Sequence, residues 1–385
     1  MSTLKVGGIR GTGASSDAIS VNATDGSCTA KITNPKSFRN LLINGQMIIS
    51  QRSTSTASIS SGTTHVLDRW GLEVTSGGGA AVTMSQSSTA PAGFSKSLKI
   101  DVTTADASLD AGERWQVRQR IEGQDLAHLN YGTSDAKKVI FSFWVRSNLT
   151  GTFAVGLYQA DGAKVNSGNY TISSANTWEK KTIAINGNTS DAMNVDNTLG
   201  FQIGIGLGAG TNFTAGSATG NWSSNVNTQF PSQTNVLAST SNELYFTGCQ
   251  LEVDDGSGVA TDFEHRSFGD ELHRCKRYCY VMKGDSNDMT GAVGWCGGSD
   301  GGFPFRLPVS MRAAPTFTGS GTWRLNCPGG NGSDQTSNLV WQNDNLTFDA
   351  GWLYLSSVST SSSAGQAAFL QFRGTGTTFT WSAEL

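Results

Sequence analysis

The strongest constraint on this sequence is a two-residue alternation of apolar and polar side chains between residues 38 and 267. In "RWQVRQRI", Trp115, Val117 and Ile121 fall on one face, while Gln116 and three arginines fall on the other. A period of two is typical of a half-buried strand. Because Gly, Asn and Ser turns separate many such segments, with no helical stretch between them, the pattern predicts an antiparallel β-sandwich.

The two ends of the chain differ from this central part. Residues 283–385 repeat the alternation over a shorter length and predict a smaller C-terminal β domain, whose last strand ties the C-terminus into the fold. Residues 1–37 contain only two weak strand patterns, Leu4/Val6 and Ile19/Val21, which are too few to bury a core. We therefore expect residues 1–37 to form an anchoring or oligomerisation arm that orders by pairing with other chains.

The segment "FGDELHRCKRYCYVM", residues 268–282, has helical periodicity instead. Ser267 followed by Asp270 is a capping pattern at a helix N-terminus. Apolar positions then recur at spacings of three, four and three, at Leu272, Cys275, Cys279 and Met282. The sequence therefore predicts one short helix over 268–282 that joins the two β domains, with Arg274, Lys276 and Arg277 facing solvent or a neighbouring chain.

The two cysteines in this helix raise the alternative of a metal site. A zinc site needs four ligands at compatible spacing, and only His273 lies beside Cys275 and Cys279. We interpret the cysteines as small buried apolar side chains. The segment "EVDDGSG", residues 252–258, lacks the spacing of a calcium loop, so no cofactor is predicted, although a structural Ca²⁺ stays open.

Composition argues against several function classes. The 27 basic and 30 acidic residues give a net charge of −3, which is unlike a protein that binds nucleic acid through phosphates. The sequence has no run of about 18 apolar residues for a membrane span and no apolar segment of a secretory signal at its start. We expect synthesis in a cytosol and delivery to any outside location by another route, such as assembly on a particle.

The sequence offers no catalytic motif. None of its four histidines lies in a nucleophile-elbow, metalloprotease or phosphate-loop context. Acidic pairs such as Asp254/Asp255 and Asp270/Glu271 occur, but sequence cannot place two carboxylates across a cleft. Solvated loop acids are the favoured interpretation, and no enzyme activity is predicted.

Sugar binding is the best-supported ligand chemistry. Aromatic rings stack on the apolar faces of sugars, and such rings occur among small polar residues in two predicted loops. The residues concerned are Phe213, Trp222 and Phe230 in the loop of residues 210–230, and Tyr158 and Tyr170 beside residues 159–169. For each ring alone, the alternative of anchoring its loop to the core is favoured. As a group, they are the candidate ligand-binding residues.

Several motifs carry a resemblance to a known class of proteins. They are "NLLINGQMIISQR" (40–52), "LDRW" (67–70), "RQRIEGQDLAHLN" (118–130), "FSFWVRS" (141–147), "WEKKTIAI" (178–185), "YFTGCQLEVDDGSGVATDFEHRSFGDELHRCKRYCY" (245–280) and "FPFRLPVSMRAAPTFT" (303–318). In these the chain resembles tail-fibre and other virion appendage proteins of tailed phages, especially marine and cyanobacterial ones. Those proteins carry a jelly-roll domain similar to carbohydrate-binding modules.

The resemblance implies an all-β fold: an antiparallel jelly-roll sandwich over 38–267 and a smaller C-terminal β domain, joined by one short helix. It also implies a homotrimer on the virion surface, attached to other virion proteins through the N-terminal arm and facing host cell-surface polysaccharide. The leading hypothesis is a tail fibre or receptor-binding protein that recognises glycan without hydrolysis. A capsid decoration or head-fibre protein with a purely structural role is the alternative, and a polysaccharide depolymerase is the third.

Overall fold

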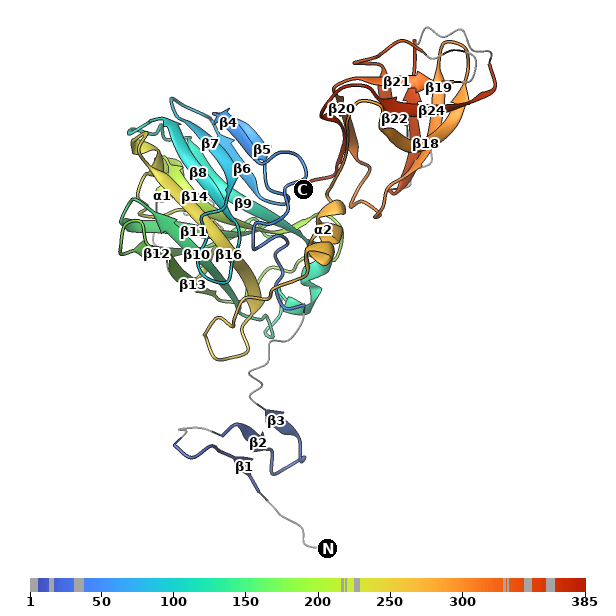
Figure 1. The fold of residues 1–385 in the computed structure, drawn as a ribbon. Coiled ribbons are helices and arrows are strands. Elements are labelled where there is room, and N and C mark those ends of the chain that lie inside the picture. The colour runs from blue at the N-terminus through green and yellow to red at the C-terminus, as the bar shows by residue number, and fades with distance from the viewer. Residues whose placement is uncertain are drawn as a thin grey trace, which may run out of the picture. The chain divides into compact units, whose positions relative to one another are not determined.

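A computed structural model describes residues 6–13, 17–30, 38–215, 218, 220–224, 229–327, 330, 332–342, 348–357 and 364–385. Antiparallel strands make up most of these residues (Figure 1), which confirms the prediction of an all-β protein. The chain divides into two compact units, Met1–Arg39 and Asn40–Leu385. Each unit is described by itself.

The first unit contains a three-stranded antiparallel sheet in the order β1-β2-β3. Its strands are β1 (Gly8–Ile9), β2 (Ile19–Val21) and β3 (Cys28–Ala30). The predicted strand at Ile19/Val21 is confirmed. A further strand lies at Gly8–Ile9, and the predicted strand at Leu4/Val6 falls partly outside the described residues, since these begin at Val6.

The sandwich in the second unit consists of two antiparallel sheets. The six-stranded sheet has the order β13 (Glu179–Ile185), β10 (Val139–Ser147), β16 (Glu243–Val253), β8 (Ser97–Thr104), β7 (Ala81–Ser87) and β4 (Ser55–Ile59). The seven-stranded sheet has the order β15 (Trp222–Ser223), β12 (Lys164–Ile172), β11 (Gly151–Gln159), β14 (Leu199–Ala209), β9 (Arg114–Glu122), β6 (Gly71–Thr75) and β5 (Gly62–His65). The chain passes repeatedly between the sheets, as a jelly roll requires.

The alternation read from the sequence decides which face of each strand is buried. On β9, Trp115, Val117 and Ile121 are buried in the core shared by both sheets. Arg114 and Arg120 lie on the opposite face and are partly exposed. Facing sheets exclude water from their inner side chains, which is the main stabilising contribution of such a sandwich.

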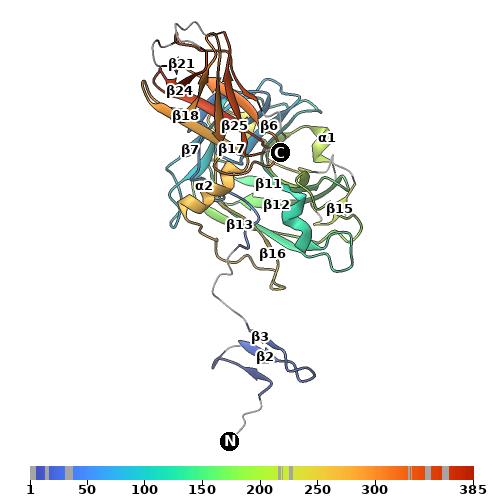
Figure 2. The same ribbon diagram turned by 90° about the vertical axis from the view of Figure 1, so that its right-hand side faces the viewer.

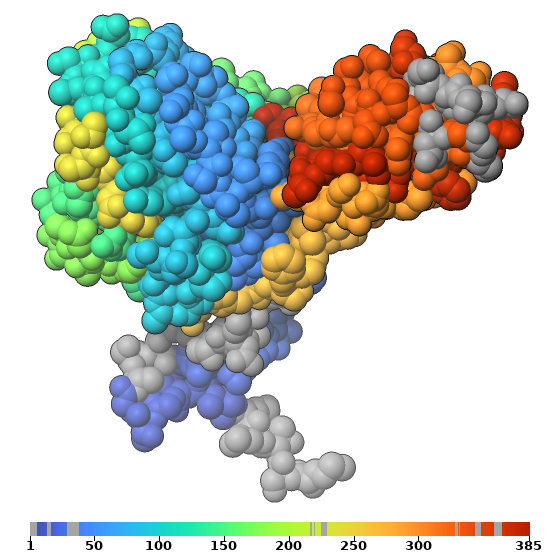
Figure 3. Space-filling model, turned by 45° about the horizontal axis from the view of Figure 1, so that its top comes forward, coloured from blue at the N-terminus to red at the C-terminus, as the bar shows by residue number. Residues whose placement is uncertain are grey.

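The C-terminal β domain has its own core and two sheets. The three-stranded sheet has the order β17 (Cys279–Gly284), β25 (Thr377–Ser382) and β20 (Thr316–Ser320). The six-stranded sheet has the order β21 (Trp323–Asn326), β24 (Gln366–Phe372), β18 (Met289–Cys296), β19 (Gly301–Arg306), β23 (Ala350–Leu355) and β22 (Leu339–Gln342). Phe303, Trp323, Phe379 and Trp381 fill the core between them. This part of the chain is coloured orange to red in Figure 3.

The predicted linking helix is shorter than expected. Helix α2 spans Phe268–Lys276, and its cap is confirmed because the Ser267 side chain accepts a hydrogen bond from the Asp270 backbone N–H. The extension to residue 282 is wrong: Cys279 begins β17, which pairs with the C-terminal strand β25 (Figure 2). Pairing with a distant strand ends the helix, and the apolar stripe predicted for one helix is divided between two elements.

Arg277, predicted to face solvent or a neighbouring chain, is partly exposed, with 32% of its side chain accessible. Its Nε and Nη2 atoms also donate to the buried carboxylate of Glu122 at 2.8 and 2.7 Å. The Tyr278 hydroxyl donates to the same carboxylate at 2.5 Å. These bonds hold the end of α2 against the end of β9.

Short helical turns occur inside the sandwich, where the sequence predicted none. They are η1 (Gly123–Leu129), α1 (Thr211–Thr214) and η3 (Val236–Ala238). In η1, Leu126 and Leu129 are three residues apart and both are buried. Helical segments of three to seven residues are too short to give a clear periodic signal in the sequence.

The C-terminus is tied into the fold, as predicted. The Glu384 carboxylate pairs with Arg69 at 2.5 Å and with Arg52 at 3.1 Å. Arg120 donates to the backbone oxygen of Leu385 at 2.8 Å. Although burial alone would raise it, the charges of Arg69, His65 and Arg52 lower the pKa of Glu384 to about 2.

Replacing Glu384 should test this tie. Glu384→Gln removes the charge that two poorly exposed arginines share, and we expect a loss of roughly 2–4 kcal/mol in the free energy of unfolding. Urea denaturation followed by fluorescence measures the loss. Asp349→Asn is the control: it breaks a pair with the exposed Arg306 and should cost less than about 1 kcal/mol. Equal losses in the two variants would contradict the assignment.

The pKa of His65 predicts how the free energy of unfolding falls at acid pH. Burial lowers the pKa of His65 to about 4, helped by the charges of Arg52, Arg69 and Arg118 and opposed by Glu384. The unfolded chain takes up this proton near pH 6.5. Stability from this group is therefore complete above pH 6.5 and falls by roughly 3 kcal/mol as the pH drops to 4. Unfolding curves of His65→Gln should be flatter over this window, and an unchanged slope would contradict the prediction.

Candidate ligand-binding site

Two of the five candidate aromatic residues are buried, so the prediction of surface rings is wrong for them. Tyr170 lies on β12 with 5% of its surface exposed. Its ring stacks on Phe153 and packs edge-on against Phe143, with centroid distances of 5.5 and 5.0 Å. The polar loop beside it suggested exposure, but the alternation of β12 turns the ring into the core.

Phe230 is fully buried on the outer face of the seven-stranded sheet. The outward positions of β14 near it are glycines: a Cβ added at Gly206 would lie 2.9 Å from the Phe230 ring, and one at Gly204 would lie 3.4 Å away. The ring therefore packs on a part of the sheet where glycines, which have no side chain, leave room for it. This packing covers part of the sheet with the chain's own segment.

The other three candidates are partly exposed but do not meet. Phe213 on α1 lies 4.9 Å from the Arg114 guanidinium. Trp222 on β15 donates its indole N–H to the Asn186 backbone oxygen at 2.6 Å. Tyr158 is on β11. No ring contact joins any two of the five candidates within the described part of the chain, so their joint role as a site stays a prediction.

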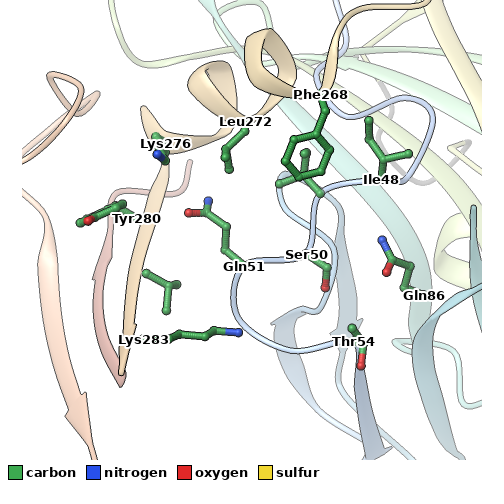
Figure 4. A pocket seen from close by; sticks show the side chains of 12 residues that line it. Ile48, Ser50, Gln51, Thr54, Gln86, Phe268, Leu272, Lys276, Tyr280 and Lys283 are labelled. Atoms are coloured by element: carbon green, nitrogen blue, oxygen red, sulfur yellow. The ribbon is translucent and has the colours of Figure 1, made fainter. Parts of the chain in front are cut away.

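A pocket of about 370 Å³ lies elsewhere, where the sandwich meets α2 and β17 (Figure 4). One wall is the loop before β4, with Gln86 of β7 beside it; the other wall is α2 followed by β17. Its lining residues are Ile48, Ile49, Ser50, Gln51, Thr54, Gln86, Phe268, Leu272, Lys276, Tyr280, Val281 and Lys283. The volume is at the lower end of those that hold small organic ligands.

The pocket has an aromatic and apolar side. Phe268, the first residue of α2, has 60% of its surface exposed, and Tyr280 of β17 is partly exposed. Figure 4 shows the Phe268 ring hanging from α2 beside Ile48. An exposed ring next to aliphatic side chains can stack on the C–H face of a sugar.

The amide side chains of the pocket are held in fixed positions. The Gln51 amide nitrogen donates to the Asp68 carboxylate at 2.5 Å and to the Cys279 backbone oxygen at 2.7 Å. The Gln86 amide nitrogen donates to the Met47 backbone oxygen at 2.8 Å. Since both nitrogens are engaged, the amide oxygens are the groups that can accept hydrogen bonds from ligand hydroxyls.

The charge of the pocket is positive. Lys276 and Lys283 line it, and neither forms an ion pair with a residue that the structure describes. The Lys276 ammonium lies 5.5 Å from the Tyr280 ring, and Figure 4 shows Lys283 extending from β17 toward the loop of Ser50 and Thr54. No carboxylate lines the pocket. The pocket thus favours a polar ligand that is neutral or negatively charged.

The pocket lacks the groups of a glycoside hydrolase. Its twelve lining residues include no Asp, Glu or His, so no pair of carboxylates can act as acid and base or nucleophile. Elsewhere, the acidic loop of residues 254–258 uses its carboxylates for turns: Asp254 accepts from the N–H groups of Gly256 and Gly258, and Asp255 accepts from that of Ser257.

The two neighbouring cysteines are not reactive groups. Cys275 and Cys279 are fully buried free thiols, and burial raises the pKa of both. Within the described ranges, no cluster of three or more His, Cys, Asp or Glu side chains could hold a metal ion. Within the same ranges, no helix is long and apolar enough to cross a membrane.

Comparison with known proteins gives distant structural likenesses alone. No family model matches the sequence, and no curated protein matches it. The enzymatically active domain of tailspike protein 4 of bacteriophage CBA120 aligns with 56% of this chain at 12% identity and a TM-score of 0.28. The chain covers 21% of that tailspike domain's length.

Carbohydrate-binding modules align over a similar part of the chain. The family 11 module from Clostridium thermocellum, in complex with a β-1,3-1,4-mixed-linked tetrasaccharide, aligns with 55% of this chain and 99% of its own at 10% identity and a TM-score of 0.28. The module TmCBM61, in complex with β-1,4-galactotriose, aligns with 56% and 99% at 11% identity and a TM-score of 0.28. At these values the alignments do not assign a function.

Alanine variants of Phe230 and Phe268 should differ in stability, because the Phe230 ring is buried and the Phe268 ring is mostly exposed. Phe230→Ala empties a buried position and should lower the free energy of unfolding by about 3 kcal/mol or more. Phe268→Ala removes a mostly exposed ring and should change it by less than about 0.5 kcal/mol. Thermal and urea denaturation of both variants measure the difference. A larger loss in Phe268→Ala than in Phe230→Ala would contradict the placement of both rings.

Proposed function

We propose that this chain is a virion appendage protein of a tailed phage, a tail fibre or receptor-binding protein, that recognises a host cell-surface glycan without hydrolysing it. The observation that carries the binding part is the pocket beside α2. It combines the exposed Phe268 ring, the fixed amides of Gln51 and Gln86, and the ammonium groups of Lys276 and Lys283. This is the chemistry that recognises a sugar ring and its hydroxyl or acidic substituents.

Two further features support an adhesin. The pocket lining has no carboxylate pair, which favours binding over hydrolysis. Residues 1–39 form a compact unit distinct from the unit that contains the two β domains, which suits a segment that attaches to other virion proteins. The resemblance of residues 40–318 to phage appendage proteins supports the location on a particle.

A glycan array tests the binding. We expect the intact protein to bind host polysaccharide, with acidic glycans favoured and with no release of reducing ends. Phe268→Ala should weaken binding at least tenfold, which corresponds to about 1.4 kcal/mol. Phe348→Ala is the matched control, since Phe348 is also an exposed phenylalanine, with 40% of its surface exposed, and is not in the pocket.

Three outcomes would contradict the proposal. Equal binding by wild type and Phe268→Ala would place any glycan site elsewhere. Release of oligosaccharide, abolished by replacing one Asp or Glu, would show a depolymerase. A position on the phage head, with normal adsorption after deletion of the protein, would show the structural alternative, a capsid decoration.

A further inference from the structure

One face of the C-terminal six-stranded sheet is apolar and exposed. Strand pairing places its residues together: Trp295 pairs with Gly302, and Val293 pairs with Phe369. Trp352 pairs with Pro304 on the next pair of strands. Because paired residues share a face, these side chains form one surface on the outside of the sheet. We name it the outer apolar face; its large members are Met289, Val293, Trp295, Val340, Trp352 and Phe369.

Each of these six side chains is substantially exposed. The exposed fractions are 52% for Met289, 53% for Val293, 39% for Trp295, 46% for Val340, 42% for Trp352 and 41% for Phe369. The opposite side of the same strands is the domain core, where Cys296, Leu353 and Leu370 are buried. The strands are therefore apolar on both faces, whereas an antiparallel sheet that meets water on one side is polar there.

The size of this face matches the apolar part of a subunit interface. Side chains of this size, exposed by about two fifths to a half, present on the order of 500 Å² of apolar surface together. A standard interface takes about 800 Å² from each partner, of which roughly 65% is apolar in homodimers, or about 520 Å². The apolar surface of the outer apolar face therefore matches the apolar area that one partner contributes to a standard homodimer interface.

The charges at this face also resemble the core of an interface. Its large residues are uncharged, and Gln371 and Gln342 continue it along β24 and β22. The charged groups beside it are Asp300, whose carboxylate accepts a hydrogen bond from the Tyr354 hydroxyl at 2.6 Å, Arg324 on the edge strand β21, and Arg306 at the end of β19, which pairs with Asp349. An uncharged aromatic centre with charges at the rim is the usual composition of protein–protein contacts.

We propose that the outer apolar face binds a second copy of this chain, so that the C-terminal β domains associate through it. A flat sheet face can meet its own copy in a closed symmetric arrangement, which buries the same six side chains on every subunit. The area agrees with this occupant, and the mixture of Val, Met, Phe and Trp fits an interface better than the row of rings that a sugar chain would need. The inference does not depend on the glycan pocket.

Sedimentation of the full chain provides the first test. We expect wild type to be an oligomer at micromolar concentration, and Val293→Lys to raise the dissociation constant of the C-terminal contact at least tenfold by burying a charge. Val195→Lys, at a position with 65% of its surface exposed on the sandwich, is the control and should change nothing. Trp352→Ala should act in the same direction as Val293→Lys and decides the test if that variant does not fold.

Cross-linking identifies the contact itself and separates it from pairing of the N-terminal arm. Benzoylphenylalanine at position 352 should form links between chains to residues 289–306 and 366–372, whereas the same group at position 195 should form none. A monomeric wild type, or links that map elsewhere, would overturn the proposal. Loss of glycan binding by Trp352→Ala with an unchanged oligomer would also overturn it, since the face would then be a glycan surface. Loss in Phe268→Ala tests the pocket separately.

Discussion

The fold of the second unit depends on two carboxylates at one end of the sandwich, the buried Glu122 and the Glu384 side chain, which is 10% exposed. Glu122 accepts four hydrogen bonds, two from Arg277 and one each from Tyr278 and Gln124. Burial alone would raise the pKa of Glu122, but the bonds from Arg277 and Tyr278 lower it. Arg69 lies 3.4 Å from the centre of the Tyr278 ring and pairs with Glu384. A buried carboxylate is tolerated only when such partners surround it, so the ends of β9, α2 and β25 must come together.

This junction also creates the candidate binding site. The pocket has one wall from the sandwich and one from α2 and β17, and Gln51 bonds to both, through Asp68 and the Cys279 backbone. The outer face of the seven-stranded sheet is different, because Phe230 fills its glycine surface and Arg120 binds the last residue of the chain. These segments of the chain cover part of the seven-stranded sheet and keep a ligand from it. The exposed groups that could contact a ligand lie instead at the junction of the sandwich with α2 and β17.

The sequence predicted the elements whose signal is local. Alternation placed Trp115 and Val117 in the core, and the cap at Ser267 marked where α2 begins. The prediction failed where pairing between segments far apart in the sequence determines the structure. Cys279 continues a helical apolar pattern in the sequence, but it lies in a strand because β17 pairs with β25. The pocket could not be predicted, since residues 48–54 and 268–283 meet only in the folded chain. The outer apolar face did have a signal, because "GWLYL" carries large apolar residues at both phases of a strand.

The two proposed surfaces have a common consequence. A pocket of about 370 Å³ holds little more than one or two sugar rings, and so few contacts give weak affinity to a single site. Association of chains through the C-terminal sheets would present several such pockets on one particle, and linked sites bind a repetitive polysaccharide far more tightly than one site does. Since the pocket and the outer apolar face share no residue, association through that face would not use the pocket residues as contacts. An adhesin built this way needs only modest chemistry in each pocket, because the number of copies supplies the remaining affinity.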